Sequence, residues 1–247
     1  MPTPHNSVPP ATSRSASNNT GVQSVSPTAG WRSARPDPSA RSALEALAVK
    51  GRAPKTGFSR RQFGAAWTDA NQAHWGENSL STREDILSRD LVDVLCKYRV
   101  TKASPHCVVQ SGQLHDPYTG MSIGFVRGSE TSTLVPVDHV VSLGDAWQKG
   151  AQQLSTIERT NFANDPLNLI TTTRVANLAK RDSDAATWLV PNRHFRCSYV
   201  ARQIAVKTRY RLWVTDAEKQ AMSRVLSRCP NESATTDVQA TSRTTWS

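Results

Sequence analysis

The residues with the clearest chemical potential lie in the segment VPVDHVVSL (135–143), where Asp138 and His139 interrupt an apolar run. An ionised carboxylate is costly to bury alone, so Asp138 requires a cation, a hydrogen-bond network or solvent. Neighbouring side chains of a regular strand point to opposite faces, so a bulge or a strand end is needed for both residues to reach one site. A structural Asp–His pair at a strand end is the alternative explanation.

Two amides and a lysine follow at spacings that suit a shared site. Asn168 lies within the apolar segment NDPLNLI (164–170), which is predicted to contain a strand. Asn177 comes later on a predicted helix, and Lys180 follows one helical turn further on the same face. An Asp–His pair on one strand, an Asn on a second strand and a third ligand on a helix is the order found in a ββα-metal nuclease.

The chain around these residues predicts an α+β fold, with a small set of strands surrounded by helices. The turn-rich segment DPYTG (116–120) separates two predicted strands of a hairpin. Capping-box spacings begin predicted helices at Ser81, Ser155 and Thr215. Other boundaries follow apolar periodicity. The predicted helices cover 40–50, 81–98, 174–180, 192–211 and 215–229, with one more starting at Ser155, and the predicted strands cover 107–114, 121–125, 134–143 and 167–171.

Composition divides the chain into one folded region and two tails. Residues 1–39 are rich in Pro and Ser and contain almost no large apolar side chains. Such a segment cannot offset its ordering entropy, so it is predicted to be disordered. Residues 230–247 are rich in Thr and Ser and receive the same prediction. The predicted domain therefore covers residues 40–229.

The charge balance favours an anionic partner. The 247 residues contain 30 Lys and Arg against 20 Asp and Glu, a formal net charge of +10. This excess favours nucleic acid or another polyanion. A basic run that includes Arg60 and Arg61 is either a solvated face or a track for DNA. No apolar run is long enough to cross a bilayer, so we predict no transmembrane segment and no membrane partner.

Four cysteines, Cys96, Cys107, Cys197 and Cys229, are spaced too widely for a structural zinc site. In an oxidising compartment they allow two disulfides in any of three pairings, whereas in the cytosol they would stay reduced. The N-terminus has no apolar stretch typical of a secretory signal, which favours the cytosol.

Several blocks of the sequence together resemble the HNH endonuclease family, in the group related to the C-terminal domain of GmrSD-type restriction enzymes. The blocks are VKGRAPKTGF (49–58), STREDILSRDL (81–91), DPYTG (116–120), VPVDHVVSLGDAWQKGA (135–151), FANDPLNLI (162–170), NLAKRD (177–182) and WLVP (188–191). The resemblance covers residues 40–229. It implies an α+β fold with a ββα-metal core (an HNH or His-Me finger), a β-hairpin and surrounding helices.

The resemblance also implies a metal-dependent endonuclease that hydrolyses phosphodiester bonds, with DNA as the expected nucleic acid. His139 matches the first His of the motif and is expected to be the general base, a task that suits a near-neutral pKa. Asp138 and Asn177 are expected to hold one divalent ion through oxygen atoms. Mg²⁺ is the hard cation that such ligands favour, and it would act as a Lewis acid.

Other side chains receive expected roles around this centre. Asn168 matches the central Asn, whose amide is expected to bridge the backbone and orient the His loop. Lys180 is expected to contact the scissile phosphate, with Arg181 as the alternative. Arg83, at the start of the predicted helix 81–98, is expected either to meet phosphate or to be a structural ion-pair partner.

The chain departs from the family pattern near this centre. Arg181 stands where relatives have Gly, and Ala185 and Thr187 stand where they have a Pro and an acidic residue. These departures favour an alternative function, a nuclease-like protein that binds nucleic acid without cleaving it. An RNA-directed nuclease toxin is the third hypothesis. No protein partner is predicted.

The resemblance also bears on the cysteines and on the compartment. Relatives have a Cys-Asp pair where this chain has Leu80-Ser81, while Cys96 is additional here. We therefore predict that Cys96 pairs with Cys107 and that Cys197 pairs with Cys229. Relatives in this group are often exported, so family and cysteine pattern favour secretion, against the missing signal.

Overall fold

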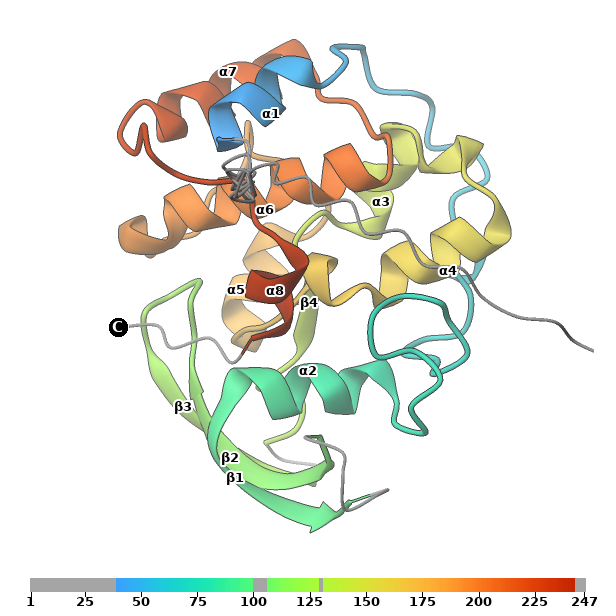
Figure 1. The fold of residues 1–247 in the computed structure, drawn as a ribbon, viewed down its shortest axis with the longest axis vertical. Helices are drawn as coiled ribbons and strands as arrows, with labels where there is room; N and C mark the ends of the chain where they lie inside the picture. The colour runs from blue at the N-terminus through green and yellow to red at the C-terminus, as the bar shows by residue number, and fades with distance from the viewer. Residues whose placement is uncertain (1–38, 100–105, 129–130, 243–247) are drawn as a thin grey trace, which may run out of the picture. The chain divides into compact units, whose positions relative to one another are not determined.

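A computed structural model describes residues 39–99, 106–128 and 131–242 (Figure 1). Its α-helices are α1 (Ala40–Ala46), α2 (Thr82–Asp90), α3 (Leu143–Gln148), α4 (Thr156–Asn164), α5 (Arg174–Lys180), α6 (Arg196–Arg209), α7 (Asp216–Leu226) and α8 (Asp237–Thr241). Short 3₁₀ helices are η1 (Arg60–Phe63), η2 (Ala151–Gln153), η3 (Pro166–Asn168) and η4 (Arg193–Phe195). The strands are β1 (Leu91–Tyr98), β2 (Val108–His115), β3 (Ser122–Val126), β4 (Val137–His139) and β5 (Leu169–Thr171). The predicted α+β class is confirmed. Apart from Ser39, the predicted N-terminal tail lies outside the described residues.

Two small antiparallel sheets carry the strands. The first has the order β1-β2-β3, and the predicted hairpin between β2 and β3 is confirmed. Its turn is closed by a hydrogen bond of 2.8 Å from the Asp116 N–H to the Met121 carbonyl. The second sheet pairs β4 with β5, with His139 opposite Leu169. Helix α5 follows β5 almost directly, whereas α3, α4 and two short 3₁₀ helices separate β4 from β5 along the chain.

The predicted helix 81–98 is wrong in its second half. Helix α2 ends at Asp90, and Leu91–Tyr98 forms β1, which pairs with β2. Leu91 and Val94 fit a strand as well as a helix, so their apolar spacing does not choose between the two. The choice comes from pairing with β2, a contact made later in the chain, together with packing of Leu91 into the core under the sheet.

The predicted strand 134–143 is longer than the observed one. Only Val137–His139 pairs with β5, and α3 begins at Leu143, where the Ser142 hydroxyl accepts a hydrogen bond from the Asp145 N–H. Val140 and Val141 are buried without continuing the ladder. The end of β4 and the start of α3 are both buried, so their apolar residues form one continuous run in the sequence.

One of the three predicted capping boxes is complete. At Ser155 the side chain and the N3 glutamate both form their reciprocal bonds. At Ser81 no side-chain cap forms. At Thr215 the hydroxyl accepts from the Glu218 N–H, but the Glu218 carboxylate joins a buried charge network instead of returning to the cap.

The folded region extends past the predicted boundary at Cys229. Residues 230–242 are described and include α8, whose Ala240 is buried. The Ala240 carbonyl accepts a hydrogen bond of 2.7 Å from Arg89, and Ser39 forms a β-bridge with Ser233. The polar composition of residues 230–242 predicts a tail, but this segment packs against the folded core.

Helix α6 lies at the centre of the main core, and α1 and α7 pack against it (Figure 1). Helix α2 contacts both sheets, next to a separate apolar cluster beneath β1 and β2. The predicted disulfides Cys96–Cys107 and Cys197–Cys229 are confirmed. The first joins β1 to the residue before β2, and the second joins α6 to Cys229, which follows the end of α7.

Candidate active site

His139 ends β4, and its imidazole is held from two sides. Nε2 lies 2.9 Å from the carbonyl oxygen of Ala163. The Trp67 ring stacks on the imidazole with 5.5 Å between ring centroids and 12° between ring planes. Because a carbonyl oxygen can only accept, Nε2 carries the proton and Nδ1 keeps its lone pair. Within the described part of the chain no group hydrogen-bonds to Nδ1.

The electrostatic surroundings keep this imidazole neutral. Burial lowers the pKa of His139 to about 3, and the positive charges of Lys180 and Arg60 act in the same direction. The ring is therefore uncharged at neutral pH. A neutral ring with an unprotonated Nδ1 is able to accept a proton.

The backbone after His139 is held by Asn168, which is fully buried at the end of η3. Its Oδ1 accepts from the Val141 N–H at 2.9 Å, and its Nδ2 lies 3.3 Å from the carbonyl oxygens of Val141 and Phe162. The Asn168 carbonyl accepts from the Val140 N–H at 2.7 Å. One amide side chain thus joins the backbone that follows His139 to the helix that supplies the partner of Nε2.

Two buried arginines support the segment that carries Asn168. Arg89 donates to the carbonyl oxygens of Pro166 and Leu169 at 3.0 and 2.7 Å. Arg202 donates to the same two carbonyls at 2.6 and 3.0 Å. Since carbonyls on both sides of Asn168 receive charged donors, the 3₁₀ turn that positions its amide is fixed.

A cavity of about 360 Å³ lies beside His139. Its lining residues are Arg60, Arg61, Phe63, Gly64, Ala65, Ala66, Trp67, His139, Leu143 and Ala163. Arg60 and Arg61 are exposed, and within the described residues neither guanidinium forms a hydrogen bond or an ion pair. Unpaired guanidinium groups beside a neutral imidazole create a site for an anionic group close to a base.

Part of this cavity could not be predicted from the sequence. The sequence indicates Arg60 and Arg61 only as members of a basic run, and it gives Trp67 no role. The segment RRQFGAAW (60–67) places two arginines before Phe63 and Trp67, but Phe63 is buried and Trp67 stacks on His139, so the arginines are the groups open to a ligand.

Asp138 contacts a different set of residues from His139. The Lys180 ammonium lies 3.0 Å from Asp138 Oδ2 and 2.7 Å from the His139 carbonyl oxygen, and the Tyr118 hydroxyl donates to Oδ2 at 2.8 Å. Burial raises the pKa of Asp138, opposed by the charge of Lys180 and the bond from Tyr118. The Lys180 side chain is 0% exposed, which is at odds with its expected contact to a scissile phosphate.

Asn177 is half-buried on α5, and within the described residues its side chain has no hydrogen bond. The cavity beside His139 is lined by neither Asn177 nor Asp138. Since β4 and β5 pair in regular register, no bulge turns Asp138 and His139 toward one side. The three side chains expected around one cation therefore do not share this cavity.

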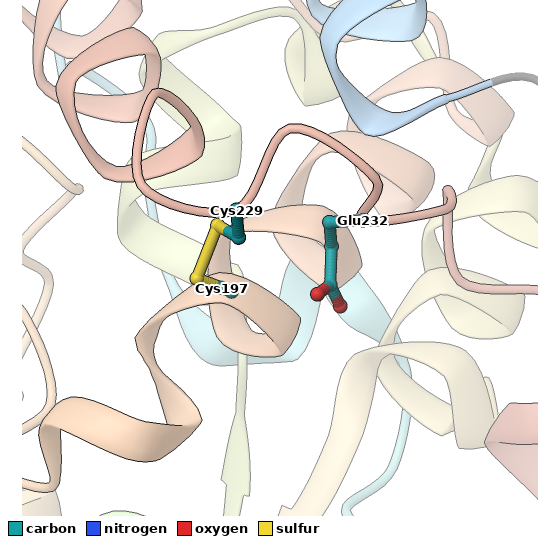
Figure 2. A group of neighbouring side chains, drawn as sticks. All are labelled: Cys197, Cys229 and Glu232. Atoms are coloured by element: carbon teal, nitrogen blue, oxygen red, sulfur yellow. A yellow bond between two sulfur atoms is a disulfide. The ribbon is translucent and has the colours of Figure 1, made fainter.

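The observed contacts do not leave Asp138 ready for a metal ion. Both of its oxygens lie within 3.2 Å of the Lys180 ammonium, which already neutralises the carboxylate. Among the described residues, the group of three His, Cys, Asp or Glu side chains that could converge on one ion is Cys197, Cys229 and Glu232. Its two sulfur atoms are bonded to each other and offer no thiolate (Figure 2).

Arg83 and Arg181 have contrasting surroundings. The Arg83 guanidinium lies 3.3 Å from the carbonyl oxygens of Ser132 and Val135, and 5.9 Å from the centre of the Phe125 ring. Arg181 is exposed and follows α5 with a φ of 52°. That left-handed conformation favours the glycine of the family pattern. Arg83 therefore supports the chain before β4, whereas Arg181 is open to solvent.

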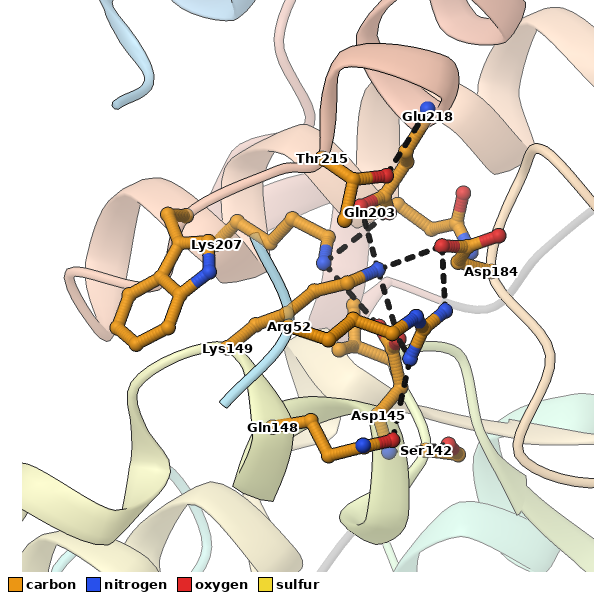
Figure 3. Close-up of polar contacts among 12 residues, drawn as sticks. Arg52, Ser142, Asp145, Gln148, Lys149, Asp184, Gln203, Lys207, Thr215 and Glu218 are labelled. Atoms are coloured by element: carbon orange, nitrogen blue, oxygen red, sulfur yellow. Dashed lines mark hydrogen bonds and ion pairs between the residues drawn. The ribbon is translucent and has the colours of Figure 1, made fainter. Parts of the chain in front are cut away.

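A buried network of charges connects α3, which follows β4, to α7 (Figure 3). The Lys149 ammonium lies 2.7 Å from Asp145 Oδ1, 2.7 Å from Asp184 Oδ2 and 2.6 Å from Glu218 Oε2. The side chains of Lys149 and Glu218 are 0% exposed. All three ammonium protons thus have a carboxylate partner.

Two more cations complete this network. Lys207 lies 3.2 Å from Asp145 and 3.1 Å from Glu218, and Arg52 lies 3.0 Å from Asp145 and 2.6 Å from Asp184. Three cations face three carboxylates, so the network is neutral as a whole. Burial opposes ionisation of Asp145, but the charge of Lys207 and its neighbours lowers the pKa of Asp145 to about 2.

A neutral, buried imidazole therefore lies beside a cavity lined by two exposed arginines, within an α+β fold. The sequence profile of the family described as GmrSD restriction endonucleases, C-terminal domain, matches residues 81–225. The chain belongs to this family. Membership indicates a nuclease-like role, implies a nucleic-acid substrate and suggests use of a divalent metal.

A protein of Arthroderma benhamiae (strain ATCC MYA-4681 / CBS 112371) with the description "Uncharacterized secreted protein" is 34% identical to this chain over 194 residues. The match covers 77% of this chain and 84% of that protein. No solved structure matches the chain significantly. In the described ranges, none of the helices combines the length and the apolar character needed to span a membrane.

Proposed function

We propose that the protein is an HNH-type endonuclease that hydrolyses phosphodiester bonds of DNA, with His139 as its general base. The observation that carries the proposal is the protonation state of His139. The Ala163 carbonyl retains the proton on Nε2, and burial keeps the ring neutral, so Nδ1 has a free lone pair. A general base needs an unprotonated nitrogen, and the low pKa of His139 makes this nitrogen a weaker base than the near-neutral value expected from the sequence. The family supports nucleic acid as the substrate.

In the proposed reaction, Nδ1 of His139 takes a proton from water as the water oxygen attacks phosphorus. The new P–O bond forms, the bond from phosphorus to the 3′-oxygen breaks, and the leaving oxygen is protonated from solvent. Arg60 and Arg61 line the same cavity and offset the negative charge that develops on the phosphate.

Three residues act as positioning residues in this proposal. Trp67 stacks on the ring of His139, Asn168 holds the backbone that follows it, and Lys180 donates to its carbonyl oxygen. Each contact restricts the direction in which Nδ1 points, and small displacements of a catalytic group are costly to rate.

We propose Mg²⁺ as the ion, on the basis of the family and of the oxygen ligands that Asp138 and Asn177 offer. Asp138 and Asn177 do not form a preformed metal site, because the Lys180 ammonium is ion-paired with the Asp138 carboxylate. Binding at this position requires Asp138 to separate from Lys180.

A protein that binds nucleic acid without cleaving it is the second candidate. The Asp138–Lys180 pair favours it, since that pair neutralises the only carboxylate expected to hold the ion. The small residue Ala185 and the neutral Thr187, in place of the family's Pro and acidic residue, point in the same direction.

Cleavage of supercoiled plasmid tests these proposals. We expect wild type with Mg²⁺ to produce nicked and linear DNA, EDTA to stop cleavage, and His139→Ala to reduce the rate by about 10² to 10⁴. His115→Ala, at an exposed histidine on β2 that contacts Ser122, is the matched control and retains the full rate. Equal cleavage by His139→Ala refutes the base, and cleavage in EDTA refutes the metal. DNA binding without cleavage by wild type establishes the second candidate.

We further propose that the chain folds in an oxidising compartment, outside the cytosol. Two disulfides and a relative described as secreted support this. Thiol titration of protein isolated natively from its source is expected to find no reactive thiol until a reductant is added. Four titratable thiols in unfolded, unreduced protein would contradict it.

A further inference from the structure

A second cavity, of about 510 Å³, lies between the start of α6 and the end of α7. It shares no lining residue with the cavity at His139. Arg193 and Arg196 line it from η4 and the start of α6, and Arg224 and Arg228 line it from α7 and the residues just after it. The two sides of this cavity therefore come from segments that are distant in sequence.

The charge of this cavity has one sign. His194 adds a fifth basic side chain to the four arginines, and none of the lining residues is Asp or Glu. Arg193, Arg224 and Arg228 are exposed, and within the described residues their guanidinium groups form no hydrogen bond or ion pair. The Glu232 carboxylate lies within 4.8 Å of the Cys197 sulfur but does not line the cavity, so the unpaired guanidinium groups leave an excess of positive charge that an anion would offset.

A disulfide fixes the two sides of the cavity to each other. Cys197 lines the cavity and is bonded to Cys229, which directly follows Arg228 (Figure 2). The disulfide thus links the segment with Arg193 to the segment with Arg228. The disulfide therefore keeps the two segments at a fixed separation, although the exposed arginine side chains still have to order around a ligand.

The composition of the lining favours one kind of anion. Leu189, Val225 and alanine side chains line the cavity together with the arginines. Arginines that line a concave site can contact successive phosphates of a chain, whereas a flat lipid surface is met by projecting side chains.

We propose that this basic cavity binds the sugar–phosphate backbone of nucleic acid as a second contact, separate from the cavity of His139. The inference rests on the proposed function only for the class of ligand, because binding here requires no hydrolysis. Several phosphate contacts away from the scissile bond orient a long duplex and strengthen its binding without selecting a sequence.

Salt-dependent binding tests this proposal in a His139→Ala background, with EDTA and a fluorescent DNA duplex. The test variant removes the three exposed arginines together (Arg193→Gln, Arg224→Gln, Arg228→Gln). Its slope of log affinity against log salt is expected to fall by about 2 to 3, and its affinity at 0.1 M salt by about two orders of magnitude. The control, Arg41→Gln with Lys97→Gln and Arg174→Gln, removes the same charge from exposed side chains outside the cavity and is expected to change the slope by less than about 1.

The outcomes separate this inference from the proposed hydrolysis. Equal slopes for the test and control variants overturn the inference, because net charge alone then explains binding. If the test variant binds DNA as well as the control does but no longer binds phosphatidylserine vesicles, the inference is overturned in favour of a lipid surface. If wild type never cuts plasmid but the salt slope falls only in the test variant, hydrolysis is refuted and the second contact is supported. If wild type cuts plasmid but the test and control variants have equal salt slopes, hydrolysis is supported and the second contact is refuted.

Discussion

Replacing Lys149 by methionine removes the ammonium that three buried carboxylates share. The substitution keeps most of the side-chain volume but cuts contacts of 2.6 to 2.7 Å to Asp145, Asp184 and Glu218. Two cations then face three carboxylates, and one buried negative charge is left uncompensated. Breaking a buried ion pair from one side costs about 3–5 kcal/mol. For a domain of this size that corresponds to a fall of about 10 °C in melting temperature.

Urea unfolding followed by circular dichroism measures this loss. Lys219→Met is the matched control, since Lys219 pairs with the exposed Glu45 at 2.8 Å, and an exposed pair contributes less than about 1 kcal/mol. Lys149→Met with Glu218→Gln restores charge balance and is expected to recover part of the loss. If Lys149→Met lowers the unfolding free energy no more than Lys219→Met does, the network does not stabilise the fold.

The same network determines how stability depends on pH. Burial opposes ionisation of Asp145, but the charge of Lys207 and its neighbours prevails and lowers the pKa of Asp145 to about 2, below its unfolded value near 4. The stabilisation is therefore complete above about pH 5 and is lost as the pH falls toward 2. It amounts to about 2 kcal/mol for this carboxylate. A wild type with constant unfolding free energy between pH 6 and 3 would contradict this assignment.

Three further predictions concern single features of the fold. Arg181→Gly is expected to raise the unfolding free energy by about 1 kcal/mol, because φ is 52° at this position; destabilisation in urea would refute the strain. Arg60→Gln with Arg61→Gln is expected to lower kcat/KM on plasmid about a hundredfold with unchanged melting, and an unchanged kcat/KM would exclude these arginines from the reaction. Cys197→Ser with Cys229→Ser, which opens a loop of 32 residues, is expected to cost about 4 kcal/mol in urea unfolding, and a loss below about 1 kcal/mol would contradict it.

Local signals predicted many elements of this fold. The turn segment 116–120 predicted the hairpin of β2 and β3, and residues 174–180 form α5 as expected. Both rest on short-range chemistry, turn residues in one case and periodicity in the other. The segment 91–98 was predicted incorrectly because its apolar spacing suits either element, and its partner β2 is chosen by contacts that the local pattern does not contain.

The candidate site could be predicted only in outline. The order of Asp138, His139 and Asn168 along the chain identified the strands that meet, and Asn168 lies across the backbone after His139. The pairing of Lys180 with Asp138 was not predicted, because a lysine at the end of a short helix is usually solvated. Lys149 was missed for the same reason, since only the tertiary fold shows that its carboxylate partners surround it.

The hydrogen bonds of the Arg89 guanidinium show that the folded domain includes α8. One of the guanidinium nitrogens donates to the Ala240 carbonyl at 2.7 Å as well as to Pro166. A chain cut after Cys229 would lose that acceptor and weaken the hydrogen bonding of the buried Arg89, which also holds Pro166, two positions before Asn168 in η3. Helix α8 therefore helps to hold the segment 166–169, which positions the backbone after His139. Removing α8 would leave this segment, and with it the candidate site, less constrained.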